Sequence, residues 1–178
     1  MKKTIDVYEH MGEILKGVKS GVLITGKADD KVNSMTISWG MLGIEWGKPI
    51  FVTFIRENRF TRSLIEKTGE FTVSIPIDDC AKKILGFCGS KSGRDIDKAK
   101  EIGLTYEEPE MTSVPGVKEL PLTLECKVVY KQTQDTEAMT EENREKFYPQ
   151  NVESSFSGAN RDTHIAYYGE IVDAYVIE

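Results

Sequence analysis

Three of the six arginines of the chain fall within residues 56–62. An apolar run ends just before them and a helical pattern begins at Phe60, which predicts a strand-to-helix junction. The N-terminus of a helix offers unpaired N–H groups, and guanidinium groups match phosphate oxygens. The junction is therefore suited to a phosphate monoester, with Thr61 as a further donor. The alternative is a solvated basic face that pairs with Glu57 and Glu66.

A second candidate is the loop at residues 86–98, which is rich in small residues and cations. A Walker phosphate loop needs Lys directly after its second Gly on a strand-to-helix turn, whereas Lys91 follows Ser90 after a predicted helix. The remaining interpretation is a donor-rich loop in which Lys91 and Arg94 precede another helix. The alternative is an ordinary connection between two helices.

A third candidate is the predicted strand at residues 33–40, whose two faces differ. One face carries Ser34, Thr36 and Ser38, and the other carries Asn33, Met35, Ile37 and Trp39. Hydroxyl groups and free strand N–H groups can bond the carbonyls and ring nitrogens of a flat heterocycle, while Trp39 can cover its aromatic face. The alternative is an edge strand whose Ser and Thr side chains face water.

Alternating or β-branched apolar runs predict the strands that position these segments. The strands are expected at residues 21–25, 32–39, 50–55, 70–75, 122–130 and 164–176. A turn at 29–31 joins the first two into a hairpin. Thr123 and Glu125 alternate with apolar residues, which predicts a half-exposed strand. The last segment is expected as one long strand, or as two strands broken at Gly169.

Helix signals predict three short helices between the strands. They are expected at residues 60–67, 78–87 and 95–101. Asn58 is the expected N-cap of the first. Hairpin-linked strands need no crossover helix, and a closed sheet has no exposed edges. We therefore predict a mainly β, antiparallel closed sheet with short peripheral helices, in a single domain over residues 1–178.

Charge and composition restrict the possible partners. The 178 residues include 23 Lys and Arg against 29 Asp and Glu, which gives a net charge of −6. Nucleic acids and anionic membranes reward positive charge, so neither is expected as a partner. Asp6 and Glu9 interrupt the start of the chain where a signal peptide is apolar, and we expect a cytoplasmic protein. Cys80, Cys88 and Cys126 are expected as buried free thiols, with no metal site.

In their order along the chain, four segments resemble the flavin reductase-like family, which includes flavoredoxins. They are residues 33–40, 56–61, 88–98 and 164–171, and the resemblance covers nearly the whole chain. It implies an FMN-binding split β-barrel, antiparallel and Greek-key-like, that is usually a homodimer with flavin sites near the subunit interface. The implied activity passes electrons from NAD(P)H, a transient donor, through FMN to an acceptor.

The resemblance also implies the site residues. Those along the isoalloxazine and ribityl chain are Asn33, Ser34, Met35, Thr36, Ser38 and Trp39. Those around the phosphate are Arg56, Asn58, Arg59 and Thr61. Those that complete the pocket are Ser90, Lys91, Ser92, Gly93 and Arg94. His164 is the candidate catalytic residue, beside the flavin or the approach of the nicotinamide.

Two stretches depart from the family pattern, and other functions stay open. Glu57 and Asn58 stand where many relatives carry small residues or Pro, and residues 135–162 align with no catalytic role, so we expect a lid or a dimer arm there. Val172, Ala174 and Val176 are expected to join this arm in a homodimer. One alternative is an electron-transfer flavoprotein that a redox protein partner reduces. Another is a non-enzymatic binder of haem or a phosphate-bearing ligand.

Overall fold

The computed structural model describes residues 1–77, 81–153 and 158–178. The strands are β1 (Lys2–Thr4), β2 (Val22–Ala28), β3 (Lys31–Ile37), β4 (Gly40–Glu45), β5 (Lys48–Arg56), β6 (Glu70–Ile75), β7 (Tyr106–Glu107), β8 (Gly116–Val117), β9 (Leu122–Thr133) and β10 (His164–Ile177). The helices are α1 (Val7–Ser20), α2 (Phe60–Thr68), α3 (Lys82–Ser90), α4 (Lys98–Ile102) and α5 (Glu141–Phe147), with a 3₁₀ turn η2 at Thr136–Ala138.

One antiparallel sheet dominates the fold, as predicted. Its strands follow the order β3-β2-β6-β9-β10-β5-β4, and β1 pairs with β10. No ladder joins β3 to β4 within the described ranges, so the barrel is split there, as the resemblance implied. The chain passes from β3 to β4 through Ser38 and Trp39, which lie outside both strands. This link borders the site described below.

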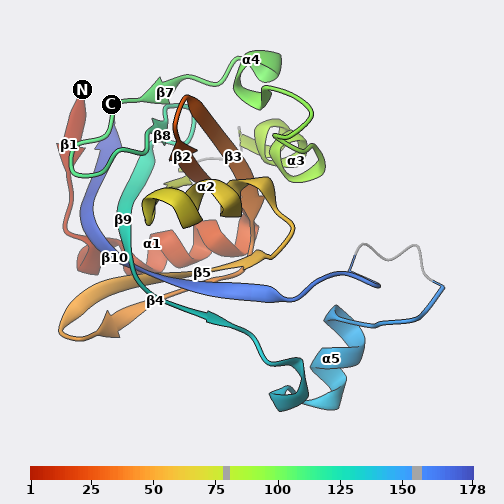
Figure 1. Ribbon diagram of the computed structural model, residues 1–178. Coiled ribbons are helices and arrows are strands. Elements are labelled where there is room, and N and C mark those ends of the chain that lie inside the picture. Colours follow the sequence, from red (N-terminus) through yellow and green to blue (C-terminus); the bar gives the residue numbers. More distant parts are fainter. Residues whose placement is uncertain (78–80, 154–157) are drawn as a thin grey trace.

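The core lies inside the curved sheet and includes a helix that the sequence pattern did not reveal. Ile14 and Val18 of α1 belong to the same buried cluster as Phe51 and Phe71 from the sheet. Gly12 and Gly17 weaken the helical pattern of α1, because glycine is a poor helix former. β1 and β10 bring the two termini together in space (Figure 1), where the N-terminal amine of Met1 bonds the Glu178 carbonyl.

Several predicted element ends differ from the structure. The N-cap of α2 is Arg59 and not Asn58, and its side chain makes no capping hydrogen bond. α4 begins at Lys98, after an Asp97 N-cap that accepts a hydrogen bond from a backbone N–H, and not at residue 95. The predicted helix start at residues 78–79 lies outside the described residues, and α3 extends to Ser90.

The predicted exposed face of β9 is correct at Lys127 but wrong at Thr123 and Glu125. Thr123 and Glu125 are fully buried, because the loop that precedes β8 covers this face. The Glu125 carboxylate accepts backbone N–H groups of Glu110, Met111 and Thr112. A polar residue in an alternating pattern can therefore face a loop as well as water, and the pattern alone does not separate the two cases.

After β9 the chain leaves the sheet and returns only at β10. We name the intervening segment, residues 135–162, the arm; its η2 and α5 project away from the barrel (Figure 1). β10 is one strand of 14 residues whose register shifts between Tyr168 and Gly169. Of the two predicted alternatives, the single long strand is confirmed and the break at Gly169 is wrong, although the register shifts there.

No helix among the described residues combines the length and the apolar character that a membrane crossing requires.

Replacement of Gly169 by Ala should destabilise the fold. A Cβ atom there would lie 2.5 Å from Phe71 Cζ and 2.8 Å from Cys126 Cβ, in a fully buried part of the core. Overpacking of this kind costs about 1–3 kcal/mol of unfolding free energy. Urea unfolding monitored by circular dichroism measures it. The matched control is Gly43→Ala in β4, where nothing lies within 4 Å of the new atom. Equal unfolding midpoints for the two variants would contradict this packing.

Candidate functional site

Two adjoining cavities, of about 650 and 270 Å³, form one cleft at the split of the barrel. Both cavities are bordered by Met35 and Thr36 of β3, Asn58, Arg59, Gly89 and Arg161. Cations gather at one end and rings at the other. We name the cationic end by Arg59, Lys91, Arg94, Lys98 and Arg161, and the aromatic end by Trp39, Phe54, Phe147 and His164.

The cationic end concentrates positive charge in an acidic protein. Its described lining holds five Lys and Arg side chains and no Asp or Glu. None of the five forms an ion pair with another described residue. Arg62 differs from these five, because it pairs with Glu66 and donates to the Glu57 carbonyl. The alternative interpretation of residues 56–62 as a solvated basic face therefore applies to Arg62, whereas Arg59 borders the cleft.

Lys98 is the buried cation of this group, with 4% of its surface exposed. Its Nζ donates to the Ser34 carbonyl at 3.0 Å and to the Cys88 carbonyl at 2.7 Å. An ammonium group carries three N–H donors, so one donor is left for the cleft. Burial is the main cause that lowers the pKa of Lys98, and nearby Arg59 lowers it further. An anion in the cleft would oppose both effects.

The start of α2 and the 91–94 loop complete the cationic end. Because the Arg59 side chain does not cap α2, the first N–H groups of the helix have no side-chain partner there. Thr61 is buried, and its hydroxyl accepts a hydrogen bond from Asn33 Nδ2 at 2.7 Å. At Gly93 a Cβ would lie 2.1 Å from Asn33 Oδ1, so the loop approaches β3 only because this residue lacks a side chain. Arg94 donates to the Asn58 carbonyl at 2.8 Å.

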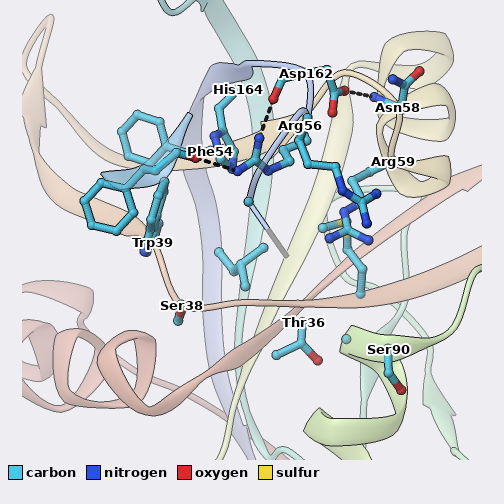
Figure 2. A pocket seen from close by; sticks show the side chains of 16 residues that line it. Thr36, Ser38, Trp39, Phe54, Arg56, Asn58, Arg59, Ser90, Asp162 and His164 are labelled. Atoms are coloured by element: carbon cyan, nitrogen blue, oxygen red, sulfur yellow. Dashed lines mark hydrogen bonds between the residues drawn. The ribbon is translucent and has the colours of Figure 1, made fainter. Parts of the chain in front are cut away.

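The aromatic end gathers rings from separate parts of the chain (Figure 2). The Trp39 ring lies 5.0 Å from the His164 ring and 5.2 Å from the Phe147 ring, centroid to centroid. Phe54 extends this lining from β5. Flat apolar surfaces of this kind suit a planar heterocycle.

Arg56 holds the arm against the cleft. Its guanidinium donates to the carbonyls of Asp162 and, at 3.2 Å, of Phe147, and both of these arm residues line the cleft. The Asp162 carboxylate in turn accepts the Asn58 backbone N–H (Figure 2). Arg56 therefore lies at the aromatic end with two of its donors engaged, and not among the cations expected around a phosphate.

His164 is a buried neutral imidazole, with 8% of its surface exposed. Its Nδ1 lies 2.7 Å from the Tyr148 hydroxyl, which belongs to the arm. Burial, followed by the charge of Arg56, lowers the pKa of His164 to about 4. The side chain is therefore uncharged near neutral pH.

The structure brings the predicted cofactor residues to this cleft, with Ser34 as the exception. The Ser34 hydroxyl is buried against Thr25 at 2.8 Å, and only its carbonyl acts on the site, through Lys98. Sequence reasoning missed Phe54, Gly89, Lys98, Phe147 and Arg161. For Lys98 a signal existed, since it follows an Asp N-cap within the loop that was singled out. For Phe147 and Arg161 none existed, because the fold of the arm places them.

Cys88 borders the cationic end of the cleft, where its carbonyl accepts a hydrogen bond from Lys98. Cys88 and Cys126 are buried free thiols, as predicted, and burial raises the pKa of each. Cys80 lies outside the described residues. Across the described ranges, no three His, Cys, Asp or Glu side chains converge as a metal site would require.

Comparison with known proteins identifies the class. The flavin reductase like domain model matches residues 15–178, and the chain belongs to this family. An uncharacterized protein of Archaeoglobus fulgidus is 31% identical over 120 residues, which cover 67% of this chain and 66% of that protein. The uncharacterized protein YddH of Escherichia coli is 30% identical over 132 residues, which cover 72% of this chain and 69% of YddH. The alignments thus span about two thirds of these relatives.

Solved structures share the fold. Flavoredoxin from Methanosarcina acetivorans superposes with a TM-score of 0.63 at 25% identity, over 89% of this chain and 68% of that one. An FMN-binding domain of a flavin reductases-like enzyme from Shewanella baltica gives 0.67 at 17% identity, over 99% and 77%. The chain therefore has the split-barrel fold of a flavin-binding family, and some of its structural neighbours bind FMN.

The buried neutral His164 should make stability depend on pH. Between about pH 6.5 and pH 4, His164 is protonated in the unfolded chain, where its pKa is near 6.5, but not in the folded protein, where its pKa is about 4. Stability is therefore lost as pH falls from about 6.5 to about 4, by about 3 kcal/mol for a shift of this size.

Urea unfolding across this pH range measures the effect, and His164→Phe serves as the comparison because it keeps a ring but does not titrate. We expect a smaller loss in the variant than in the wild type. Parallel pH profiles would show that His164 is not held neutral.

Proposed function

We propose that the cleft binds FMN and that the protein passes electrons from NAD(P)H through this flavin to an acceptor. The observation that carries the proposal is a group of five cations, without an ion pair to any described residue, at one end of a cleft whose other end is aromatic. FMN has the same polarity, with a flat ring at one end and a terminal phosphate dianion at the other. The family and its FMN-binding neighbours support this choice over haem.

The residues present fit such a ligand. Arg59, Arg94 and Lys98 offer charged donors for a phosphate, and the uncapped start of α2 adds backbone N–H groups. Because Gly93 has no side chain, the 91–94 loop can lie close to Asn33 at this end of the cleft. Trp39 offers a ring face and Ser38 a hydroxyl at the aromatic end. When bound, FMN supplies the redox chemistry, and the side chains bind it, orient it and exclude water.

The donor proposed for the reaction is a reduced nicotinamide. Phe54, Phe147 and His164 border the aromatic end beside Trp39, so a second flat ring finds apolar neighbours there. Hydride transfer between the two rings needs no protein base. A neutral His164 agrees with this role, since it adds no positive charge beside the reacting atoms.

We predict tighter binding of FMN than of riboflavin, because riboflavin lacks the phosphate. Arg59→Ala removes a charge-assisted hydrogen bond worth about 1.5–3 kcal/mol, which corresponds to roughly ten- to a hundredfold in FMN affinity. Its riboflavin affinity should stay near that of the wild type. Fluorescence titration of the flavin-free protein measures all four dissociation constants.

The control is Arg62→Ala, because Arg62 is paired with Glu66 and does not border the cleft. We expect little change in its FMN affinity. Equal affinities of the wild-type protein for FMN and riboflavin would overturn the assignment of the cationic end to the phosphate.

Anaerobic mixing with NADH or NADPH tests the electron donor. Oxidised flavin absorbs at about 450 nm, and the FMN-loaded protein should lose this absorption when NADH or NADPH is added. A flavin that neither nicotinamide bleaches, but that a reduced redox protein does, would favour the electron-transfer alternative. The net charge of −6 suits a basic protein partner and keeps this alternative in view.

We also propose a homodimer, formed by the face of the sheet on which Met41, Val52, Tyr168 and Tyr130 lie in register across β4, β5, β10 and β9. Met41 and Tyr130 are exposed on this face, and the exposed Trp46 contacts Tyr130. The surface differs from the one expected from sequence, since Ala174 is buried and Val176 packs against the core of its own chain. Apolar surface of this kind marks a contact with another protein, and a second copy satisfies it symmetrically.

Light scattering at micromolar concentration should give about 40 kDa, twice the 20.0 kDa of the chain. Met41→Glu should shift the mass toward 20.0 kDa, because it places a charge on this exposed surface. A monomer in the wild type would overturn the proposal.

A further inference from the structure

A chain of hydrogen bonds links the arm to His164. Tyr148, which follows α5, lies with its hydroxyl 3.1 Å from Gln134 Oε1 and 2.7 Å from His164 Nδ1. The Gln134 backbone N–H also donates to the His164 carbonyl at 2.9 Å, which fixes the two residues relative to each other. Tyr148 is buried, and Arg56 lies over its ring at 5.2 Å.

The donors and acceptors of this chain determine where its protons lie. An amide oxygen can only accept, so the contact with Gln134 Oε1 requires the single hydroxyl proton of Tyr148. The Tyr148 oxygen is then the acceptor for His164, and Nδ1 must carry the imidazole proton. Burial raises the pKa of Tyr148, which keeps its hydroxyl proton in place. A neutral imidazole with Nδ1–H has an unprotonated Nε2.

The free Nε2 is accessible from the cleft. His164 lines the aromatic end, while Tyr148 on its Nδ1 side does not. Among the described residues, Nε2 has no hydrogen-bond partner. Three polar side-chain atoms of the described residues are fully buried without a partner: Thr53 Oγ1, Thr123 Oγ1 and the Tyr175 hydroxyl. Nε2 of His164 is not one of them, so this atom is not fully buried. An acceptor without a protein partner thus faces a ligand space.

We propose that Gln134 and Tyr148 are positioning residues that fix His164 as the Nδ1–H tautomer, so that Nε2 selects a ligand that donates an N–H at the aromatic end. For the identity of this ligand we rest on the proposed function: the carboxamide of a reduced nicotinamide carries such an N–H. A ligand that offers only a carbonyl there brings one lone pair against another and binds less well. The tautomer itself does not depend on the proposed function.

Nitrogen NMR of the flavin-free protein tests the tautomer directly. The chain has two histidines, so ¹⁵N-histidine labelling of a His10→Gln variant leaves His164 alone. At neutral pH we expect a protonated Nδ1 and an unprotonated Nε2. A protonated Nε2 in this protein would overturn the proposal.

Variants of the two positioning residues test the cause. Tyr148→Phe and Gln134→Leu should each lose the preference for Nδ1–H, while Gln134→Glu keeps an acceptor oxygen and should retain it. Circular dichroism confirms that each variant is folded. If both Tyr148→Phe and Gln134→Leu keep the wild-type tautomer, the hydrogen-bond chain does not set it and the proposal fails.

The ligand is tested with NADH and its 3-acetylpyridine analogue, which has a methyl ketone in place of the carboxamide and so lacks the N–H. Anaerobic flavin bleaching gives the ratio of the KM of the analogue to the KM of NADH. This ratio should be roughly three- to tenfold smaller in Tyr148→Phe than in the wild type, as expected for the loss of one neutral hydrogen bond. Because the ratio is compared between two proteins, the different reduction potentials of the two dinucleotides cancel. An unchanged ratio overturns the ligand selection. If only NADPH bleaches the flavin, the same comparison is made with NADPH and its 3-acetylpyridine analogue. Bleaching by neither NADH nor NADPH overturns the proposed donor, and the NMR result separates that failure from a failure of the tautomer.

Discussion

Unbalanced positive charge at one end of the cleft is the constraint around which the site is built. Arg59, Lys91, Arg94, Lys98 and Arg161 border a space without a described carboxylate, in a chain whose net charge is −6. Like charges repel more strongly where water is partly excluded. The fold tolerates this because Lys98 is anchored on two carbonyls and Arg94 on the Asn58 carbonyl. A bound dianion would relieve the repulsion, so ligand binding and stability are coupled.

Arg56 adds positive charge at the aromatic end as well. Its guanidinium holds the arm by two carbonyls and, together with burial, keeps His164 uncharged. The arm in turn supplies Phe147 to the cleft and Tyr148 to the histidine. One arginine at the end of β5 thus couples the placement of the arm, the wall of the cleft and the protonation of the residue nearest the proposed nicotinamide.

The sequence predicted those parts of the molecule that depend on local pattern. The hairpin of β2 and β3, the helix after the arginines and the long last strand follow from alternation, the apolar face of a helix and the Gly69 that ends it. The burial of Glu125 and the contacts of Arg56 and Ser34 were not predicted, because each depends on a partner far away in the chain: the loop before β8, the arm carbonyls and the ammonium of Lys98. Periodicity carries no information on such contacts.

Phosphorus NMR of the FMN complex tests the central claim, that the cationic end holds the phosphate. The dianion of a free phosphate monoester takes up a proton at about pH 6. If Arg59, Lys98 and their neighbours surround the phosphate, its resonance should stay at the dianion position between about pH 5 and pH 8. A bound FMN whose phosphate titrates near pH 6, as it does in water, would contradict the account.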